Sequence, residues 1–206
     1  MKENTHHILV EESRKYVLDL FDKYLSEKLI YHSNQHTLNV LDHAETIAAN
    51  TDISEHETEL IKIAALFHDA GYIKSYENHE MHSAIMARDF LVNRDVDKND
   101  VDVICDAILA TAIPQKPKGI IAEILCDADL MHLAAADYFE QVESIRLEWA
   151  KIGKANLNDF EFLKTSLAFF DSHHYHTNYG IKVLAPLKEV NRQRIQDRLA
   201  KSRNYG

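Results

Sequence analysis

The stretch TDISEHETELIKIAALFHDAG, residues 51–71, decides the fold of this chain. Ser54 followed three residues later by Glu57 is a capping box, the pattern that begins a helix. From there apolar residues recur every three or four positions, which is the period of a helix with a buried face. Gly71 is a natural helix C-cap. The stretch therefore predicts a helix that begins after Ser54 and runs to Gly71.

Helical periodicity continues along almost the whole chain, and breakers are scarce, with five Gly and three Pro in 206 residues. The clearest loop is PQKPKG, residues 114–119. We expect an all-α fold, a compact helical bundle of about eight to ten helices. The predicted helices cover residues 8–30, 36–50, 54–71, 79–93, 97–112, 120–135, 137–152, 157–172 and 178–202, the last bent near Pro186. We expect a single domain over residues 1–206, with a motif-bearing core at 25–135 and C-terminal helices at 137–204.

The chain is acidic, with a formal net charge of −10, and has the composition of a globular protein, 46% apolar and 27% charged. The charge argues against a nucleic-acid polymer as partner, because phosphate backbones bind basic surfaces. A small phosphorylated substrate is compatible, since a bound cation can supply positive charge. The N-terminus MKENTHHILV has no signal-peptide apolar region, no apolar run has membrane-spanning length, and two cysteines make no disulfide framework. We therefore expect a cytoplasmic protein with no membrane contact.

Acidic and histidine side chains interrupt the predicted core at two places. His68 and Asp69 follow the apolar run AALF directly, and Asp127 and Asp129 interrupt the apolar stretch EILCDADLMHL, residues 123–133. A single such Asp is most often an exposed or capping residue. Several of them beside core residues point to a shared partner, because burying charge alone is costly and a bound cation removes that cost.

Histidines also gather in YHSNQHTLNVLDHA, residues 31–44, where His32 and His36 are four apart. We expect the third, His43, on the surface of its helix. Imidazole and carboxylate together suit a divalent ion of Mn, Mg, Co, Ni, Fe or Zn. The candidate ligand set has no Cys, which disfavours a structural zinc site, and it leaves coordination positions for water and substrate. Its members are His36, His68, Asp69 and Asp129.

These motifs resemble those of the HD-type metal-dependent phosphohydrolase superfamily. The resemblance lies in a His, a His-Asp pair and an Asp in that order, in the contexts YHSNQHT, ALFHDAGY and CDADL. The C-terminal stretch FFDSHHYHTNYG looks like that of an uncharacterised bacterial branch of the superfamily. The resemblance implies an HD-domain-like helical fold and metal ligation by the four residues of the candidate set. It also implies that Asp69 bridges when a second ion binds.

In related cyclic-nucleotide phosphodiesterases the first motif reads Tyr-His-Asn-x-x-His, and its first His protonates the leaving oxygen. This chain has YHSNQH, so the resemblance implies that His32 is the general acid, although Ser33 stands where the family has Asn. An imidazole has a suitable pKa for that task near neutral pH. The alternative is that His32 is a surface residue before the helix.

Binuclear members of the superfamily carry two further His. One opens the following helix, where this chain offers His79, and the other would stand where this chain has Ala112. We therefore favour one ion, with His79 available to a second ion or to phosphate. Glu80 is either a base that orients the catalytic water or a first-turn acid that complements the helix dipole. The expected catalytic residues are His32, Asp69 and Glu80.

Three further residues are candidates for substrate contact. Lys116 lies in the predicted loop, and His173 and Tyr175 lie in DSHHYHTN; each is alternatively a solvated or packed side chain. The sequence thus predicts a phosphomonoesterase or phosphodiesterase that hydrolyses a nucleotide or another small phosphorylated compound. Two other functions stay open: a non-catalytic module that binds a nucleotide or metal, and a di-iron oxygenase of the same superfamily. The oligomeric state is also open, a homodimer included.

Overall fold

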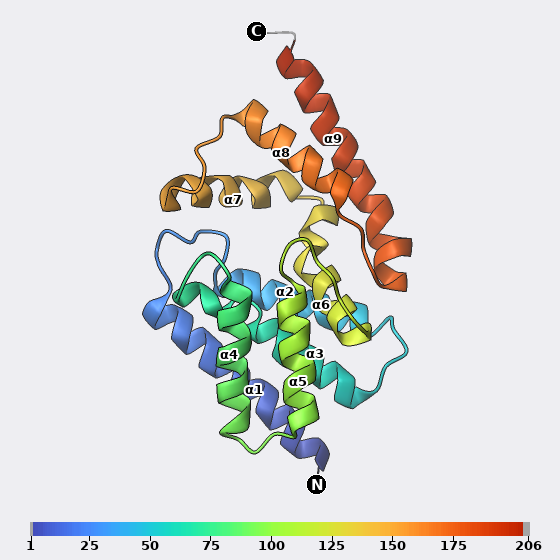
Figure 1. The fold of residues 1–206 in the computed structure, drawn as a ribbon. Coiled ribbons are helices and arrows are strands. Elements are labelled where there is room, and N and C mark those ends of the chain that lie inside the picture. Colours follow the sequence, from blue (N-terminus) through green and yellow to red (C-terminus); the bar gives the residue numbers. More distant parts are fainter. Residues whose placement is uncertain (1, 204–206) are drawn as a thin grey trace. The chain divides into compact units, whose positions relative to one another are not determined.

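The computed structural model describes residues 2–203, with side chains from residue 8 to residue 202. Within this range all regular structure is helical and no strand is present (Figure 1). The elements are nine α-helices, two 3-10 turns and one π-helical turn. The prediction of an all-α fold with about eight to ten helices is confirmed.

The described chain divides into two compact units. The first takes in the residues up to Ser26 and His32–Asp129, and the second takes in Glu27–Tyr31 and the chain from Leu130 onward. The first unit therefore ends close to the predicted end of the motif-bearing core. A single domain over residues 1–206 stays a prediction.

The first unit is built around one buried helix. It contains α1 (Lys2–Tyr24), α2 (Asn34–Ala48), α3 (Glu55–Phe67), the 3-10 turn η1 (Ala70–Ile73), α4 (His79–Val92), α5 (Lys98–Ala110) and α6 (Ile120–Asp129). The predicted capping box of Ser54 and Glu57 is formed at the start of α3. α3 packs against α1, α2, α5 and α6, and Ile61 and Leu66 are fully buried in it. A helix that is apolar on most sides is stable only when it is covered in this way.

The predicted end of this helix at Gly71 is wrong. α3 ends at Phe67 with His68 as its C-cap, and the chain turns at Asp69 into η1. Gly71 lies instead where η1 meets the start of α4. Its N–H donates to Ser83 Oγ at 2.8 Å, and a Cβ on it would come within 2.0 Å of a backbone oxygen of α4. The glycine is therefore needed for the close approach of α4, a contact between segments that a local C-cap pattern does not reveal.

The predicted helix at 120–135 is also too long. α6 stops at Asp129, and Met131–Ala134 form the second 3-10 turn, η2. Asp129 is thus the last residue of a helix rather than an interior one. At a helix end a carboxylate can turn away from the helix surface without breaking the apolar stripe that precedes it.

The second unit has an aromatic core. Besides η2 it contains α7 (Tyr138–Ile152), α8 (Asp159–Ser172), the π-helical turn η3 (Gly180–Leu184) and α9 (Ala185–Arg203). α8 packs on α9, and the buried rings of Tyr138 and Phe170 meet edge to face at 5.0 Å between centroids. The π-helical turn η3 ends two residues before Pro186, whereas the predicted bend of the last helix near Pro186 stays a prediction. A proline lacks the N–H that a regular helix requires, and a π-helical turn before it accommodates this loss.

Gly71→Ala should lower the free energy of unfolding by about 3 kcal/mol or more, because the new methyl group would meet backbone atoms that cannot move aside. Gly119→Ala is the matched control. Its φ is +84°, but nothing lies within 4 Å of its Cβ, so we expect only the strain of a left-handed residue, about 1 kcal/mol. Urea unfolding followed by circular dichroism measures both variants. Equal losses in the two would contradict the close packing of α4 on η1.

Candidate metal centre

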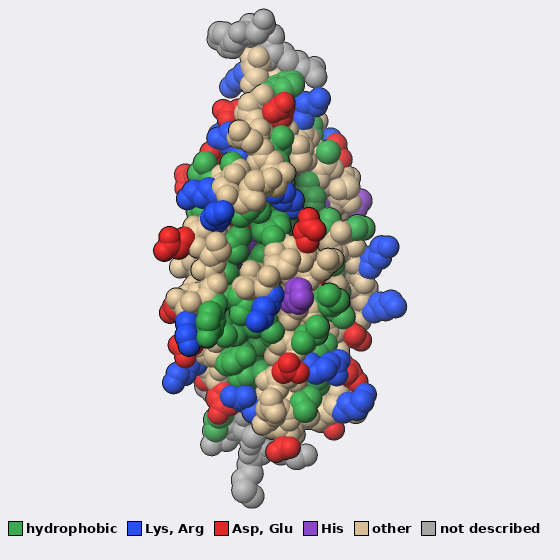
Figure 2. All heavy atoms as spheres, turned by 60° about the vertical axis from the view of Figure 1, so that its left-hand side comes forward, with side chains coloured by type: hydrophobic (Ala, Val, Ile, Leu, Met, Phe, Trp, Pro, Cys, Tyr) green, Lys and Arg blue, Asp and Glu red, His purple; other side chains and the backbone are tan. Residues whose placement is uncertain are grey.

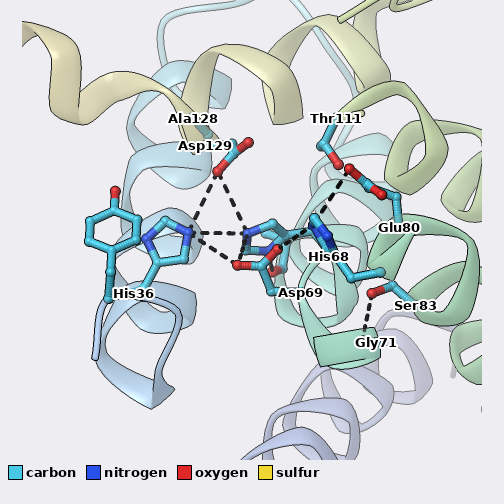
Figure 3. Close-up of polar contacts among 12 residues, drawn as sticks. His36, His68, Asp69, Gly71, Glu80, Ser83, Thr111, Ala128 and Asp129 are labelled. Atoms are coloured by element: carbon cyan, nitrogen blue, oxygen red, sulfur yellow. Dashed lines mark hydrogen bonds and ion pairs between the residues drawn. The ribbon is translucent and has the colours of Figure 1, made fainter. Parts of the chain in front are cut away.

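Four side chains of the first unit converge on one point (Figure 3). His36 lies in the first turn of α2, His68 and Asp69 follow the last residue of α3, and Asp129 ends α6. His68 Nε2 lies 3.4 Å from His36 Nε2, 3.2 Å from Asp69 Oδ2 and 3.7 Å from Asp129 Oδ1. His36 Nε2 lies 3.4 Å from Asp69 Oδ2 and 3.6 Å from Asp129 Oδ1. The structure therefore brings all four predicted ligands together.

The spacing of these donor atoms fits a divalent metal ion. Ligands about 2.1 Å from an ion stand about 3.0 Å apart in an octahedron and about 3.4 Å apart in a tetrahedron. His68 donates its Nδ1–H to the Ala65 carbonyl oxygen at 2.7 Å, which leaves the Nε2 lone pair of a neutral ring directed at the cluster. Asp69 Oδ2 is buried and makes no well-formed hydrogen bond. A cation would satisfy this donor set, and the ligand atoms of His36, His68 and Asp69 are all within 4.8 Å of one another.

In the metal-free protein the cluster holds protons instead. Burial lowers the pKa of His36, but hydrogen bonds with Asp129 and Asp69 outweigh burial and raise that pKa to about 9. Burial opposes ionisation of Asp69 too, yet the imidazoles of His68, His36 and His79, 3.2 to 3.4 Å away, hold the pKa of this carboxyl well below its usual range. At neutral pH the carboxylate is therefore ionised, and at least one imidazole proton occupies the place where a cation would bind.

His79 and Glu80, in the first turn of α4, extend the cluster on the other side of Asp69. His79 Nε2 lies 3.4 Å from Asp69 Oδ1 and 3.6 Å from Glu80 Oε1. Burial lowers the pKa of His79, but its hydrogen bond with Asp69 and the nearby charges raise it above the ordinary value. His79 is thus brought to the same carboxylate that the other imidazoles share, and Glu80 lies beside His79.

His32 lies before α2 in a bend, and Ser33 is the N-cap residue of that helix. The centroid of the His32 ring is 5.7 Å from that of His36, and 4.3 Å from that of Tyr72. The predicted general acid therefore lies beside the cluster, although the chain between His32 and His36 is not a complete helical turn.

The expectation that His43 lies on the helix surface is wrong. His43 is half-buried, and its Nδ1 lies 3.1 Å from the carbonyl oxygen of Ala128, the residue before Asp129. Burial lowers the pKa of His43, so at neutral pH the ring is uncharged and donates Nδ1–H to that carbonyl. His43 thereby holds the last turn of α6 beside α2. Its position seven residues after His36, two helical turns along the same face, is the signal that could have identified it.

The remaining predicted substrate-contact residues are placed differently. Lys116 is exposed in the loop after α5 and forms no ion pair with any described residue. His173 and Tyr175 belong to the second unit, where both are buried. Lys188 Nζ donates to the His173 carbonyl oxygen at 2.5 Å, and Tyr175 Oη donates to that of Leu130 at 3.1 Å. Contact of these residues with substrate stays a prediction.

The fold and the cluster define an all-helical protein with a candidate metal centre of nitrogen and oxygen ligands. Residues 34–134 match the HD domain family. This segment of the chain is therefore an HD domain, and the resemblance found in the motifs is confirmed. HD domains bind divalent metal ions and characterise a superfamily of metal-dependent hydrolases.

A crystal structure of a predicted HD superfamily hydrolase from an uncultured Thermotogales bacterium is similar to this chain. The similarity covers 95% of this chain and 92% of the other, with a TM-score of 0.60 and 19% sequence identity. At this identity it shows the shared fold alone. The sequence matches none of the curated proteins it was compared with.

Metal binding should release at least one proton at pH 7, because the His36 pKa of about 9 keeps that ring protonated in the metal-free protein and a metal needs it neutral. Apparent affinity for Mn²⁺ should then rise about tenfold per pH unit between pH 6 and pH 8. Above pH 9 the release should disappear. Titration calorimetry in two buffers of different ionisation enthalpy measures it, and a binding enthalpy independent of buffer at pH 7 would contradict the assignment.

Proposed function

We propose that this chain is a metal-dependent phosphohydrolase, a phosphomonoesterase or phosphodiesterase that acts on a nucleotide or another small phosphorylated compound. The observation that supports it is the convergence of His36, His68, Asp69 and Asp129, with donor atoms 3.2 to 3.7 Å apart. His36 and His68 are almost fully buried, while Asp129 keeps a side-chain exposure of 18%. The two histidines are thus shielded from solvent, which reaches the cluster on the side of Asp129.

The four residues would hold one ion of Mn, Mg, Co, Ni, Fe or Zn, as suits nitrogen and oxygen ligands. Such an ion lowers the pKa of a bound water and polarises a phosphoryl oxygen. His68 keeps its Nε2 lone pair turned inward because Nδ1–H is engaged by Ala65. Asp69, with its pKa held low, stays an anion throughout the neutral range and fixes the orientation of both neighbouring imidazoles.

His32 and Glu80 are the candidates for proton transfer and water orientation. His32 lies beside His36 and Tyr72, where a protonated ring would give its proton to the leaving oxygen of a bound phosphate ester. Glu80 Oε1 is 3.6 Å from His79 Nε2, and its side chain keeps 17% exposure, so it can accept a proton from a water held there. His79 is the candidate contact for phosphate or for a second ion.

A small substrate suits the surface of the chain better than a nucleic-acid polymer does. The net charge is −10, and on the face drawn in Figure 2 acidic and basic side chains intermingle rather than gather by sign. Extended phosphate backbones are bound by continuous basic surfaces. No helix in the described part of the chain is both long and apolar enough to cross a membrane. We retain the cytoplasm as the proposed location.

Asp69→Ala should remove the bound metal and lower phosphatase activity by more than about a hundredfold, because loss of outer-shell partners alone costs 10- to 100-fold. Asp102→Asn is the matched control, since Asp102 pairs with Arg88 and Lys98 on the surface of the same unit. Elemental analysis and hydrolysis of p-nitrophenyl phosphate with Mn²⁺ measure the two effects.

Full metal content and full activity in Asp69→Ala would refute the proposal. Metal binding without turnover of any phosphate ester by the wild type would favour the non-catalytic module instead. Bound iron with an oxygen-dependent activity would favour the di-iron oxygenase, against which Ala112 counts because it supplies no ligand.

A further inference from the structure

Tyr72 is the ring that joins the two histidines beside the metal cluster. Its centroid lies 3.9 Å from that of His79, with the planes 14° apart, and 4.3 Å from that of His32, with the planes 35° apart. The two imidazole centroids are 6.5 Å from one another. Each imidazole therefore contacts the tyrosine more closely than it contacts the other imidazole.

The backbone gives Tyr72 a fixed relation to the ligand Asp69. Tyr72 lies in η1, and its N–H donates to the Asp69 carbonyl oxygen at 3.0 Å. Side chains three residues apart in a 3-10 helix lie on the same face. Gly71, with its N–H on Ser83 Oγ, holds the same turn against α4. The tyrosine is only 8% exposed, so its ring has little freedom to swing away.

The two imidazoles that contact Tyr72 come from different segments. His79 opens α4, and its Nε2 is already bound to Asp69 Oδ1 at 3.4 Å. His32 lies in the bend before α2, outside any helix. Among its neighbouring rings that of Tyr72 is the nearest, at 4.3 Å between centroids against 5.7 Å for His36 and 6.0 Å for Tyr76, so packing against Tyr72 contributes to the orientation of His32. Aromatic pairs at these distances contribute about 0.5 to 1.5 kcal/mol beyond their buried area.

We propose that Tyr72 is a positioning residue, which holds the His32 ring at a fixed place relative to Asp69 and His79. The inference rests on the proposed function, in which His32 protonates the leaving oxygen. In that reaction the water oxygen bonds to phosphorus while the ester P–O bond breaks. The leaving oxygen takes the proton from His32, and a proton lost by the water returns to His32 through solvent. Tyr72 does not touch the substrate; it decides whether His32 reaches the leaving oxygen.

A positioning role predicts a dependence on the leaving group that general loss of structure does not. An alkyl alcohol leaves poorly without a proton, whereas p-nitrophenolate leaves well without one. General acid catalysis is therefore needed mainly for the alkyl ester. The informative quantity is the ratio of kcat for an alkyl phosphate, such as glycerol 2-phosphate, to kcat for p-nitrophenyl phosphate.

The experiment compares the Mn²⁺-loaded wild type with Tyr72→Phe, Tyr72→Leu and Tyr72→Met. Phe keeps the ring, whereas Leu and Met both remove it; Met has about the volume of Leu but is longer and unbranched, so it reaches farther into the space of the ring. We expect the kcat ratio to fall about tenfold in Tyr72→Leu and Tyr72→Met and to stay near the wild-type value in Tyr72→Phe. General acid catalysis contributes about 100- to 10,000-fold in rate, so a tenfold fall corresponds to an acid that is misplaced and not lost. Phe90→Leu is the control, because Phe90 is a ring of similar burial, 4% exposed, farther along α4.

An unchanged ratio in Tyr72→Leu would overturn the inference, whether both rates fall equally, as in a merely destabilised protein, or neither rate falls. Long-range ¹H–¹⁵N spectra of the imidazoles in the Mg²⁺-loaded protein give a readout that needs no turnover. The signals of His32 and His79 should shift in Leu and Met and keep their positions in Phe. If the wild type hydrolysed neither ester, the proposed function would fail. The positioning role is tested separately, and unchanged imidazole signals in Tyr72→Leu and Tyr72→Met would overturn it.

Discussion

The ionised carboxylate of Asp69 among buried imidazoles is the interaction on which the rest of the first unit depends. Burying such a charge without compensation costs several kcal/mol, roughly as much as the net stability of many domains. Compensation here comes from segments far apart in the chain, since His36 and His79 belong to α2 and α4 while the carboxylate follows α3. The starts of α2 and α4 therefore have to lie close to the end of α3. α3 is apolar on most sides and is the buried helix against which α2 and α4 pack.

The sequence was sufficient for the helical fold and for selecting the four residues that the structure brings together, whose role as metal ligands stays a proposal. Apolar periodicity identified the helices. His68, Asp69 and Asp129 stood out as polar interruptions next to core residues, whereas His36 was selected from the histidine-rich stretch 31–44. The ends of α3 and α6 and the role of His43 could not be read in this way. They depend on contacts between segments, such as the bond from His43 to the Ala128 carbonyl, that no local pattern contains.

The histidines of the C-terminal segment illustrate the same limit. His173 was a candidate for substrate contact on the strength of its neighbours DSHHYHTN, yet its backbone caps α8 and its side chain is buried. Lys188 donates to two carbonyl oxygens at the C-terminal end of that helix, those of Phe170 and His173. Burial and the charge of Lys188 lower the pKa of His173 to about 3, so the ring is neutral throughout the physiological range. Packing around the end of α8 therefore accounts for the burial and the neutral ring of His173.

In the proposed function, the two oxygens of Asp69 face different sets of side chains, and this difference favours one ion over two. Oδ2 faces His36 and His68 at 3.4 and 3.2 Å, and Oδ1 faces His79 at 3.4 Å. The first set is completed by Asp129. Among the described residues Glu80 lies beside the second set, and Ala112 offers no ligand atom. A site with fewer fixed ligands binds its ion more weakly, and it leaves more positions open to a phosphate oxygen. In the proposed function, the side of Asp69 that faces α4 would therefore hold substrate rather than a permanently bound metal.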